Sequence, residues 1–184
     1  MQRQAAPHIM KSVAENKKKQ NISEYIIYMY QMEDLIRSYQ FNLEDIRQYV
    51  ISHYPISDEE KIEVGFWFDD LIDRMTAQNI QEKGHLQEIQ EEVDALAKIH
   101  WELLKTDKEY FNIYQKAKPH VIDFVMAAEG HDLGHEVQIC LNGIYGLLLC
   151  RLTGKKVINE LQQSAEAFGS VLGYLSLVYK VRED

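Results

Sequence analysis

The chain has 184 residues, of which 20 are basic and 29 acidic, so its formal net charge is −9. Apolar residues make up 46% and charged residues 27%, which is typical of a folded globular domain and excludes a disordered or collagen-like chain. Nine glycines and three prolines are too few for the frequent tight turns of a β-sandwich or barrel. The sequence lacks glycine-rich nucleotide-binding loops and the glycine–serine turn of serine hydrolases, so those functions lose their usual support.

The N-terminal end differs in charge from the rest of the chain. Residues 1–20 carry five basic groups and one acidic group, and their basic run ends in three consecutive lysines. Such a short basic segment predicts a flexible N-terminal arm. The other 164 residues hold 15 basic and 28 acidic groups, and residues 21–182 are predicted to form a single helical-bundle domain.

Beyond the arm, apolar side chains recur at helical spacing, and no segment alternates as a strand would. The pattern predicts an all-α, single-domain bundle of about six or seven helices. We expect the helices approximately at residues 23–39, 43–54, 58–78, 85–105, 107–128, 137–152 and 157–181.

Residues that start and stop helices support these bounds. Asn42 and Asp107 each precede a predicted helix and suit its N-cap position. The run from Ser57 to Glu60 is a capping box, in which serine and glutamate bond to each other's backbone amides. Gly154 suits the end of the helix that precedes it, because glycine readily adopts the left-handed conformation there.

The helix at residues 137–152 is apolar almost all round, so we expect it to be the buried central helix. Small residues on it and on the last helix would let the two backbones approach closely. These small residues are Gly143 and Gly146 in the central helix and Ala165, Gly169 and Gly173 in the last one.

Two features of the sequence predict a cytoplasmic protein. Cys140 and Cys150 lie ten residues apart in one predicted helix, about 15 Å along its axis, so they cannot bridge each other. Unpaired thiols suit a reducing compartment. The first residues form no apolar signal segment, and the most apolar stretch has only sixteen residues, too few to span a membrane.

The densest group of candidate metal ligands lies in the predicted loop before the central helix. It consists of Glu129, His131, His135 and Glu136. Two imidazoles with carboxylates suit zinc or iron. Because Gly134 disfavours a helix there, the histidines need not share a face, and the alternative is a polar surface loop. A divalent metal therefore stays open, and no other cofactor is predicted.

A second group of polar side chains is spread over several predicted helices. Glu82 and His85 match the Glu-x-x-His spacing of di-iron bundles, but the motif occurs once where such sites need two. Glu33 and Arg37 lie four residues apart, which favours an ion pair. The candidate polar pocket consists of Glu33, Arg37, Asp69, Asp70 and His85. The alternative is that these residues are capping and surface groups.

Two further histidines have simpler interpretations. Arg47 and His53 fit the loose Arg-x4-6-His pattern of helical ribonucleases of the HEPN type, but the acidic charge of the chain opposes binding to a phosphate backbone. Nucleic acid is therefore disfavoured as a partner. His100 lies on the apolar stripe of its helix and is expected to be a core group with a satisfied hydrogen bond.

Four segments together resemble a known family. They are residues 22–37, 67–75, 81–87 and 141–149. The chain is similar to uncharacterised all-helical bacterial proteins, best known from Bacteroidetes and grouped as a domain of unknown function. The likeness runs from Met10 to about Lys180, and residues 1–9 have no counterpart. It implies a bacterial, cytoplasmic origin and a single helical domain, and it brings no activity, substrate or catalytic residue.

The sequence contains no complete catalytic group, so no catalytic residue is assigned. The leading hypothesis is a non-enzymatic module that binds a protein partner or associates with itself. Eleven tyrosines suit an interface, and residues 58–102, with 13 acidic and 4 basic groups, would attract a basic partner. The alternatives are a metal-dependent enzyme on a helical-bundle scaffold and an RNA-cleaving helical bundle.

Overall fold

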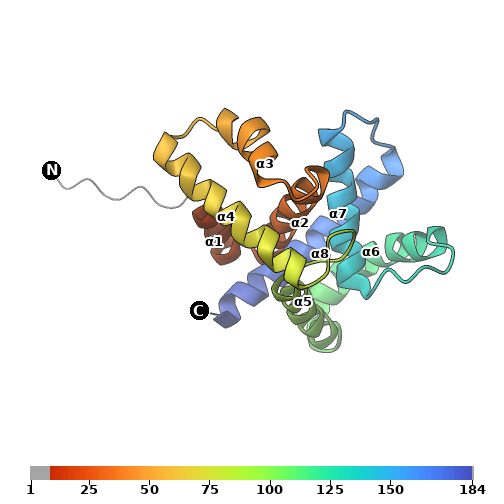
Figure 1. The fold of residues 1–184 in the computed structure, drawn as a ribbon. Coiled ribbons are helices and arrows are strands. Elements are labelled where there is room, and N and C mark those ends of the chain that lie inside the picture. The colour runs from red at the N-terminus through yellow and green to blue at the C-terminus, as the bar shows by residue number, and fades with distance from the viewer. Residues whose placement is uncertain (1–8, 184) are drawn as a thin grey trace. The chain divides into compact units, whose positions relative to one another are not determined.

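A computed structural model describes residues 9–183, and every regular element in that range is a helix (Figure 1). The all-α class predicted from the sequence is confirmed. The elements are α1 (Ile9–Gln20), α2 (Ile22–Ser38), α3 (Leu43–Tyr49), the 3-10 turn η1 (Ile51–His53), α4 (Asp58–Ala77), α5 (Gln87–Thr106), α6 (Lys108–Ala127), α7 (Glu136–Leu152) and α8 (Asn159–Glu183).

The helix that the sequence does not predict is α1, where we expect a flexible arm. Lys17 Nζ lies 3.5 Å from Glu24 Oε2, and Lys18 Nζ lies 5.5 Å from the centre of the Tyr25 ring. In addition, Ala14 is buried and α1 packs against α4 within the N-terminal unit, which explains why the segment is ordered. The remainder of the predicted arm, residues 1–8, lies outside the described residues.

Contacts divide the chain into two compact units. The N-terminal unit contains the residues up to Gln90, except for 21–23. The C-terminal unit contains residues 21–23 and everything from Glu91 onward.

The predicted helix ends agree closely with the structure. Asn42 Oδ1 accepts hydrogen bonds from the amides of the first turn of α3, and Asp107 does the same for α6. Ser57 and Glu60 form the reciprocal capping box at the start of α4. Gly154 follows α7 with φ +67°, a left-handed conformation that favours glycine.

The central helix is only partly buried, because its last turn has different surroundings from the rest. Its buried residues lie between Val137 and Leu147. Leu149 and Leu152 beyond them are exposed, as is Asn142, which bonds to the neighbouring Gln138 side chain. Apolarity all round therefore predicts burial correctly up to Leu147, and it leaves large apolar side chains in water at the C-terminal end.

Close packing of α7 against α8 depends on one of the predicted glycines. A Cβ atom at Gly143 would lie 2.6 Å from two ring carbons of Phe168, which is fully buried on α8. At Gly146 a Cβ would meet nothing within 4 Å. Of these two glycines, only Gly143 is therefore required for this approach of the two helices.

A chain of four side chains connects three helices of the C-terminal unit. The Asp107 carboxylate caps α6 and also accepts a 2.7 Å hydrogen bond from the Tyr174 hydroxyl on α8. These bonds lower the pKa of Asp107. Tyr110 belongs to the first turn of α6. Its hydroxyl oxygen is 2.5 Å from His100 Nδ1 on α5. His100 is 1% exposed, so the core position expected for it is observed.

Burial of His100 should make the stability of the protein depend on pH. Burial lowers the pKa of His100 below its ordinary value near 6.5, so the unfolded chain binds a proton at a pH where the folded chain does not. The contribution of His100 to stability is therefore fully present well above pH 6.5 and is lost progressively as the pH decreases through this value.

Urea unfolding at several pH values between 7.5 and 5.5 measures this effect. The loss of stability towards low pH should be smaller in the His100→Gln variant, because that variant lacks the buried imidazole. An identical pH dependence in the two proteins would show that His100 titrates alike in the folded and unfolded states.

Candidate functional site

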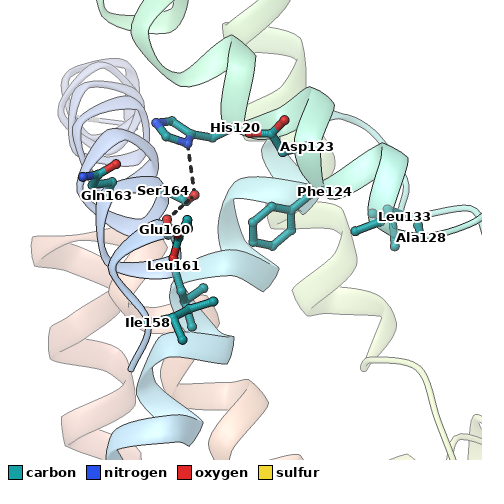
Figure 2. A pocket seen from close by; sticks show the side chains of 11 residues that line it. His120, Asp123, Phe124, Ala128, Leu133, Ile158, Glu160, Leu161, Gln163 and Ser164 are labelled. Atoms are coloured by element: carbon teal, nitrogen blue, oxygen red, sulfur yellow. Dashed lines mark hydrogen bonds between the residues drawn. The ribbon is translucent and has the colours of Figure 1, made fainter. Parts of the chain in front are cut away.

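A cavity of about 620 Å³ opens into the C-terminal unit (Figure 2). It lies between the second half of α6, the loop after α6 and the segment that begins α8. Small-molecule pockets have volumes of roughly 300–1,000 Å³. Most of the lining is apolar, with its larger contributions from Phe124, Leu133, Ile158 and Leu161.

The wall of the cavity is fixed by aromatic packing. The ring of Phe124 meets Phe168 edge to face, with their centres 5.4 Å apart. Because Gly143 has no side chain, both rings fit against α7: a Cβ there would lie 3.4 Å from Phe124 Cζ as well as touching Phe168. The part of the wall formed by Phe124 is thus held by packing against a buried ring.

A hydrogen-bonded histidine and serine face each other at the cavity (Figure 2). Ser164 Oγ lies 2.8 Å from the Glu160 carbonyl oxygen and 3.1 Å from His120 Nδ1. A carbonyl oxygen only accepts, so it takes the single hydroxyl proton. His120 Nδ1–H then donates to Ser164 Oγ, which leaves Nε2 of the neutral ring as an acceptor.

This proton arrangement argues against a nucleophilic serine. An activated serine needs a base that can accept its proton, and Nδ1 of His120 already carries one. Ser164 is also nearly buried, with 5% exposure. The pair therefore positions the imidazole, and the geometry favours binding over covalent chemistry.

The charged side chains that line the cavity are all acidic. They are Asp123 on α6 and Glu160 in the first turn of α8, and both residues are exposed. Lysine and arginine are absent from the described lining. The polar part of the site therefore consists of hydrogen-bond acceptors, apart from Gln163, whose amide can both donate and accept.

A large apolar side chain is exposed at the cavity. Ile158, which lines it, is 59% exposed. Met126 and Ile122 on α6 are exposed too, but at about 100° per residue they lie on a different face of that helix from the residues that line the cavity. An exposed apolar side chain at the opening of an apolar cavity is typical of a surface that another molecule covers.

The candidate metal ligands before α7 have separate roles in the structure. His131 Nδ1 donates to the Ala128 carbonyl oxygen. His135 is the N-cap of α7: its Nδ1 accepts from an amide of the first turn, and its Nε2 lies 3.5 Å from Asp94 Oδ1. Glu129 is exposed, with φ +50°, and Glu136 lies in the first turn of α7. The loop therefore starts a helix.

Metal ligation finds no geometric support in the described part of the chain. Among those residues, no group of three or more histidine, cysteine, aspartate or glutamate side chains is placed to hold a metal ion. The helix-starting role of His135 explains why this loop is polar without requiring a metal.

The structure brings three of the five members of the candidate polar pocket to one loop. Glu33 is fully buried on α2, where Oε1 accepts from the Leu86 amide at 2.9 Å and Oε2 lies 2.6 Å from His85 Nδ1. The His85 ring stacks on Tyr30, with ring centres 3.6 Å apart. Arg37 donates to the carbonyl oxygens of Ile80 and Gly84 in the same loop.

The other two members lie elsewhere. Asp70 pairs with Arg74 along α4 at 2.9 Å, and Asp69 is exposed. The ion pair expected between Glu33 and Arg37 is wrong: Arg37 pairs with Asp34 instead, at 2.9 Å. A helical pattern gives the spacing of Glu33 and Arg37 along one helix. It does not reveal that both side chains bond to the loop at residues 80–86.

Arg47 and His53 also take up separate contacts. Arg47 pairs with Glu44 and packs on α4, where a Cβ at Gly65 would lie 3.0 Å from its Nε. His53 Nδ1 contacts the adjacent Ser52 hydroxyl at 3.0 Å. Each side chain is accounted for by its immediate neighbours, and the contacts described do not join the two.

His120 and Ser164 are the site residues that the sequence does not reveal. They lie 44 positions apart and belong to no motif. A pocket formed by two helices and two loops has no local signature, because each segment alone shows only ordinary helical patterning. The only signal in the sequence is His120 itself, and a single histidine in a helix is equally typical of a structural core histidine.

Three further observations bear on identity. No helix in residues 9–183 is long and apolar enough to cross a membrane. No curated protein and no solved structure shows significant similarity to the chain. The family described as "Domain of unknown function (DUF4924)" matches residues 10–184, nearly the whole sequence. The chain therefore belongs to this family of helical proteins, as the resemblance in the sequence indicates.

Proposed function

We propose that this protein is a non-enzymatic interaction module and that the cavity beside α6 receives an apolar side chain of a protein partner. One observation carries the proposal: an open, apolar cavity of about 620 Å³ has the large apolar side chain of Ile158, which lines it, exposed to water. Such exposure has a cost in solution that a covering partner removes.

The alternatives are less well supported by the geometry. Ser164 has no free proton-accepting base, and the candidate metal ligands serve as caps and loop contacts. Interfaces commonly place an apolar or aromatic anchor in a pocket and surround it with polar groups. The cavity, with His120 and two carboxylates at its edge, has this form.

Blocking the cavity should weaken binding of the partner at least tenfold. Ala127 ends α6, is exposed and lines the cavity, so the Ala127→Phe variant fills the opening without disturbing the core. Ala77 is an exposed alanine that ends α4 in the other unit, and Ala77→Phe is the matched control. A photoreactive benzoylphenylalanine at position 133 would identify the partner by crosslinking in cells.

The purified partner is then titrated by calorimetry against the wild type and both variants. A tenfold loss with Ala127→Phe alone, at unchanged melting temperature, supports the proposal. Equal affinity for all three proteins contradicts it. If the crosslink joins two copies of this chain, light scattering of the same three proteins applies the test to self-association.

A further inference from the structure

We infer that the partner segment is basic: it presents a leucine-like side chain to the cavity and a lysine or arginine to the rim formed by Asp123, Glu160 and His120. This inference rests on the proposed function and adds to it the chemistry of the partner. It follows from the charge of the two carboxylates and from the hydrogen-bonding groups of the imidazole.

The two carboxylates give the rim a negative charge. Asp123 and Glu160 come from different helices and line the same cavity, so a side chain that enters it lies near two acidic residues. Glu160 also occupies the first turn of α8, where its charge offsets the positive end of the helix. Lys155 and Lys156 precede α8 but do not line the cavity.

The imidazole adds an acceptor to the rim. The Glu160 carbonyl takes the Ser164 proton and Nδ1–H of His120 donates to the Ser164 oxygen, so Nε2 of the neutral ring presents a lone pair. His120 also borders a second groove of about 340 Å³, which contains Lys116 and Glu166. The imidazole is therefore accessible from two sides rather than enclosed.

An opening lined by hydrogen-bond acceptors favours a ligand that donates hydrogen bonds. An ammonium or guanidinium group donates several hydrogen bonds and neutralises the carboxylates, whereas a carboxylate or phosphate would meet acceptors of its own sign. The apolar lining of the cavity and the exposed side chain of Ile158 require in addition that the segment carry apolar contacts. A basic amphipathic segment satisfies both requirements.

The test uses three designed helical peptides that share one leucine stripe and differ in the remaining positions: lysine, glutamine or glutamate. Each is titrated by fluorescence anisotropy into the full chain at about 0.15 M salt, where charges more than about 8 Å apart are screened. We expect the lysine peptide to bind at least tenfold more tightly than the glutamine peptide, and the glutamate peptide to bind most weakly.

Two double variants separate the rim from the general acidity of the protein. Asp123→Asn with Glu160→Gln should reduce the affinity of the lysine peptide to that of the glutamine peptide. Asp69→Asn with Asp73→Asn makes the same charge change at exposed positions of α4 and should leave the affinity nearly unchanged. Ala127→Phe should weaken the lysine and glutamine peptides alike.

The possible results distinguish the inference from the proposal beneath it. If the lysine and glutamine peptides bind equally and Ala127→Phe weakens both, the basic partner is wrong while the docking cavity stands. If both double variants reduce binding equally, the preference comes from net charge, and the inference about the rim fails. If Ala127→Phe affects neither peptide, neither occupies the cavity, and the inference and its basis both fail.

Discussion

The Glu33→Ala variant is expected to lose about 3 kcal/mol of its free energy of unfolding. Glu33 is fully buried, and its carboxylate accepts from the Leu86 amide and from His85 Nδ1. Removing it leaves the buried amide of Leu86 without an acceptor, which costs about 1–3 kcal/mol, and also removes a charge-assisted bond to the histidine. Urea unfolding monitored by circular dichroism measures the change.

Two matched variants show whether burial and hydrogen bonding are the cause. Glu33→Gln keeps an acceptor for the Leu86 amide and should lose clearly less stability than Glu33→Ala. Asp69→Ala removes an exposed carboxylate on α4 and should change stability by less than about 0.5 kcal/mol. If Glu33→Ala and Asp69→Ala had similar effects, the loop after α4 would not depend on Glu33.

The Gly143→Ala variant is expected to lose about 2 kcal/mol, although alanine is the better helix former. The added methyl would lie 2.6 Å from the Phe168 ring, and that ring is fully buried and packed against Phe124. Because the Phe168 ring is enclosed, the added methyl forces that ring or the two helices apart, and overpacking of this kind costs about 1–3 kcal/mol.

Gly146→Ala is the control for this effect on the same helix. A Cβ there meets nothing within 4 Å, so only helix propensity changes, and a gain of about 0.5–1 kcal/mol is expected. The two substitutions should therefore shift the melting temperature in opposite directions, as measured by differential scanning calorimetry. A shift in the same direction for both would show that Phe168 accommodates the methyl.

Local signals in the sequence are sufficient to predict most of the fold. Ser57 with Glu60, Asn42 and Asp107 each act within one turn of the helix that they begin, so their roles can be read from neighbouring residues alone. By contrast, α1 is held by tertiary packing of its buried Ala14 side against α4, and composition alone predicts only an arm there.

The candidate sites are harder to predict, because their members meet through tertiary packing. Residue types place Glu33 and His85 in one group, and the structure confirms that they touch. Asp69 and Asp70 fit the same reasoning equally well but lie elsewhere, since a helical pattern does not say which loop will cross it. The cavity at His120 and Ser164 joins segments 44 residues apart, so nothing local indicates it.

The Asp107 carboxylate has a wider consequence for how the C-terminal unit comes apart. The same side chain begins α6, accepts the Tyr174 hydroxyl of α8, and adjoins Tyr110, which contacts His100 on α5. Fraying at the start of α6 therefore breaks the hydrogen bond between Asp107 and Tyr174 on α8. It also removes Tyr110 from the buried imidazole of His100. Three helices are thus tied into one cooperative opening, and partial unfolding of this unit one helix at a time is disfavoured.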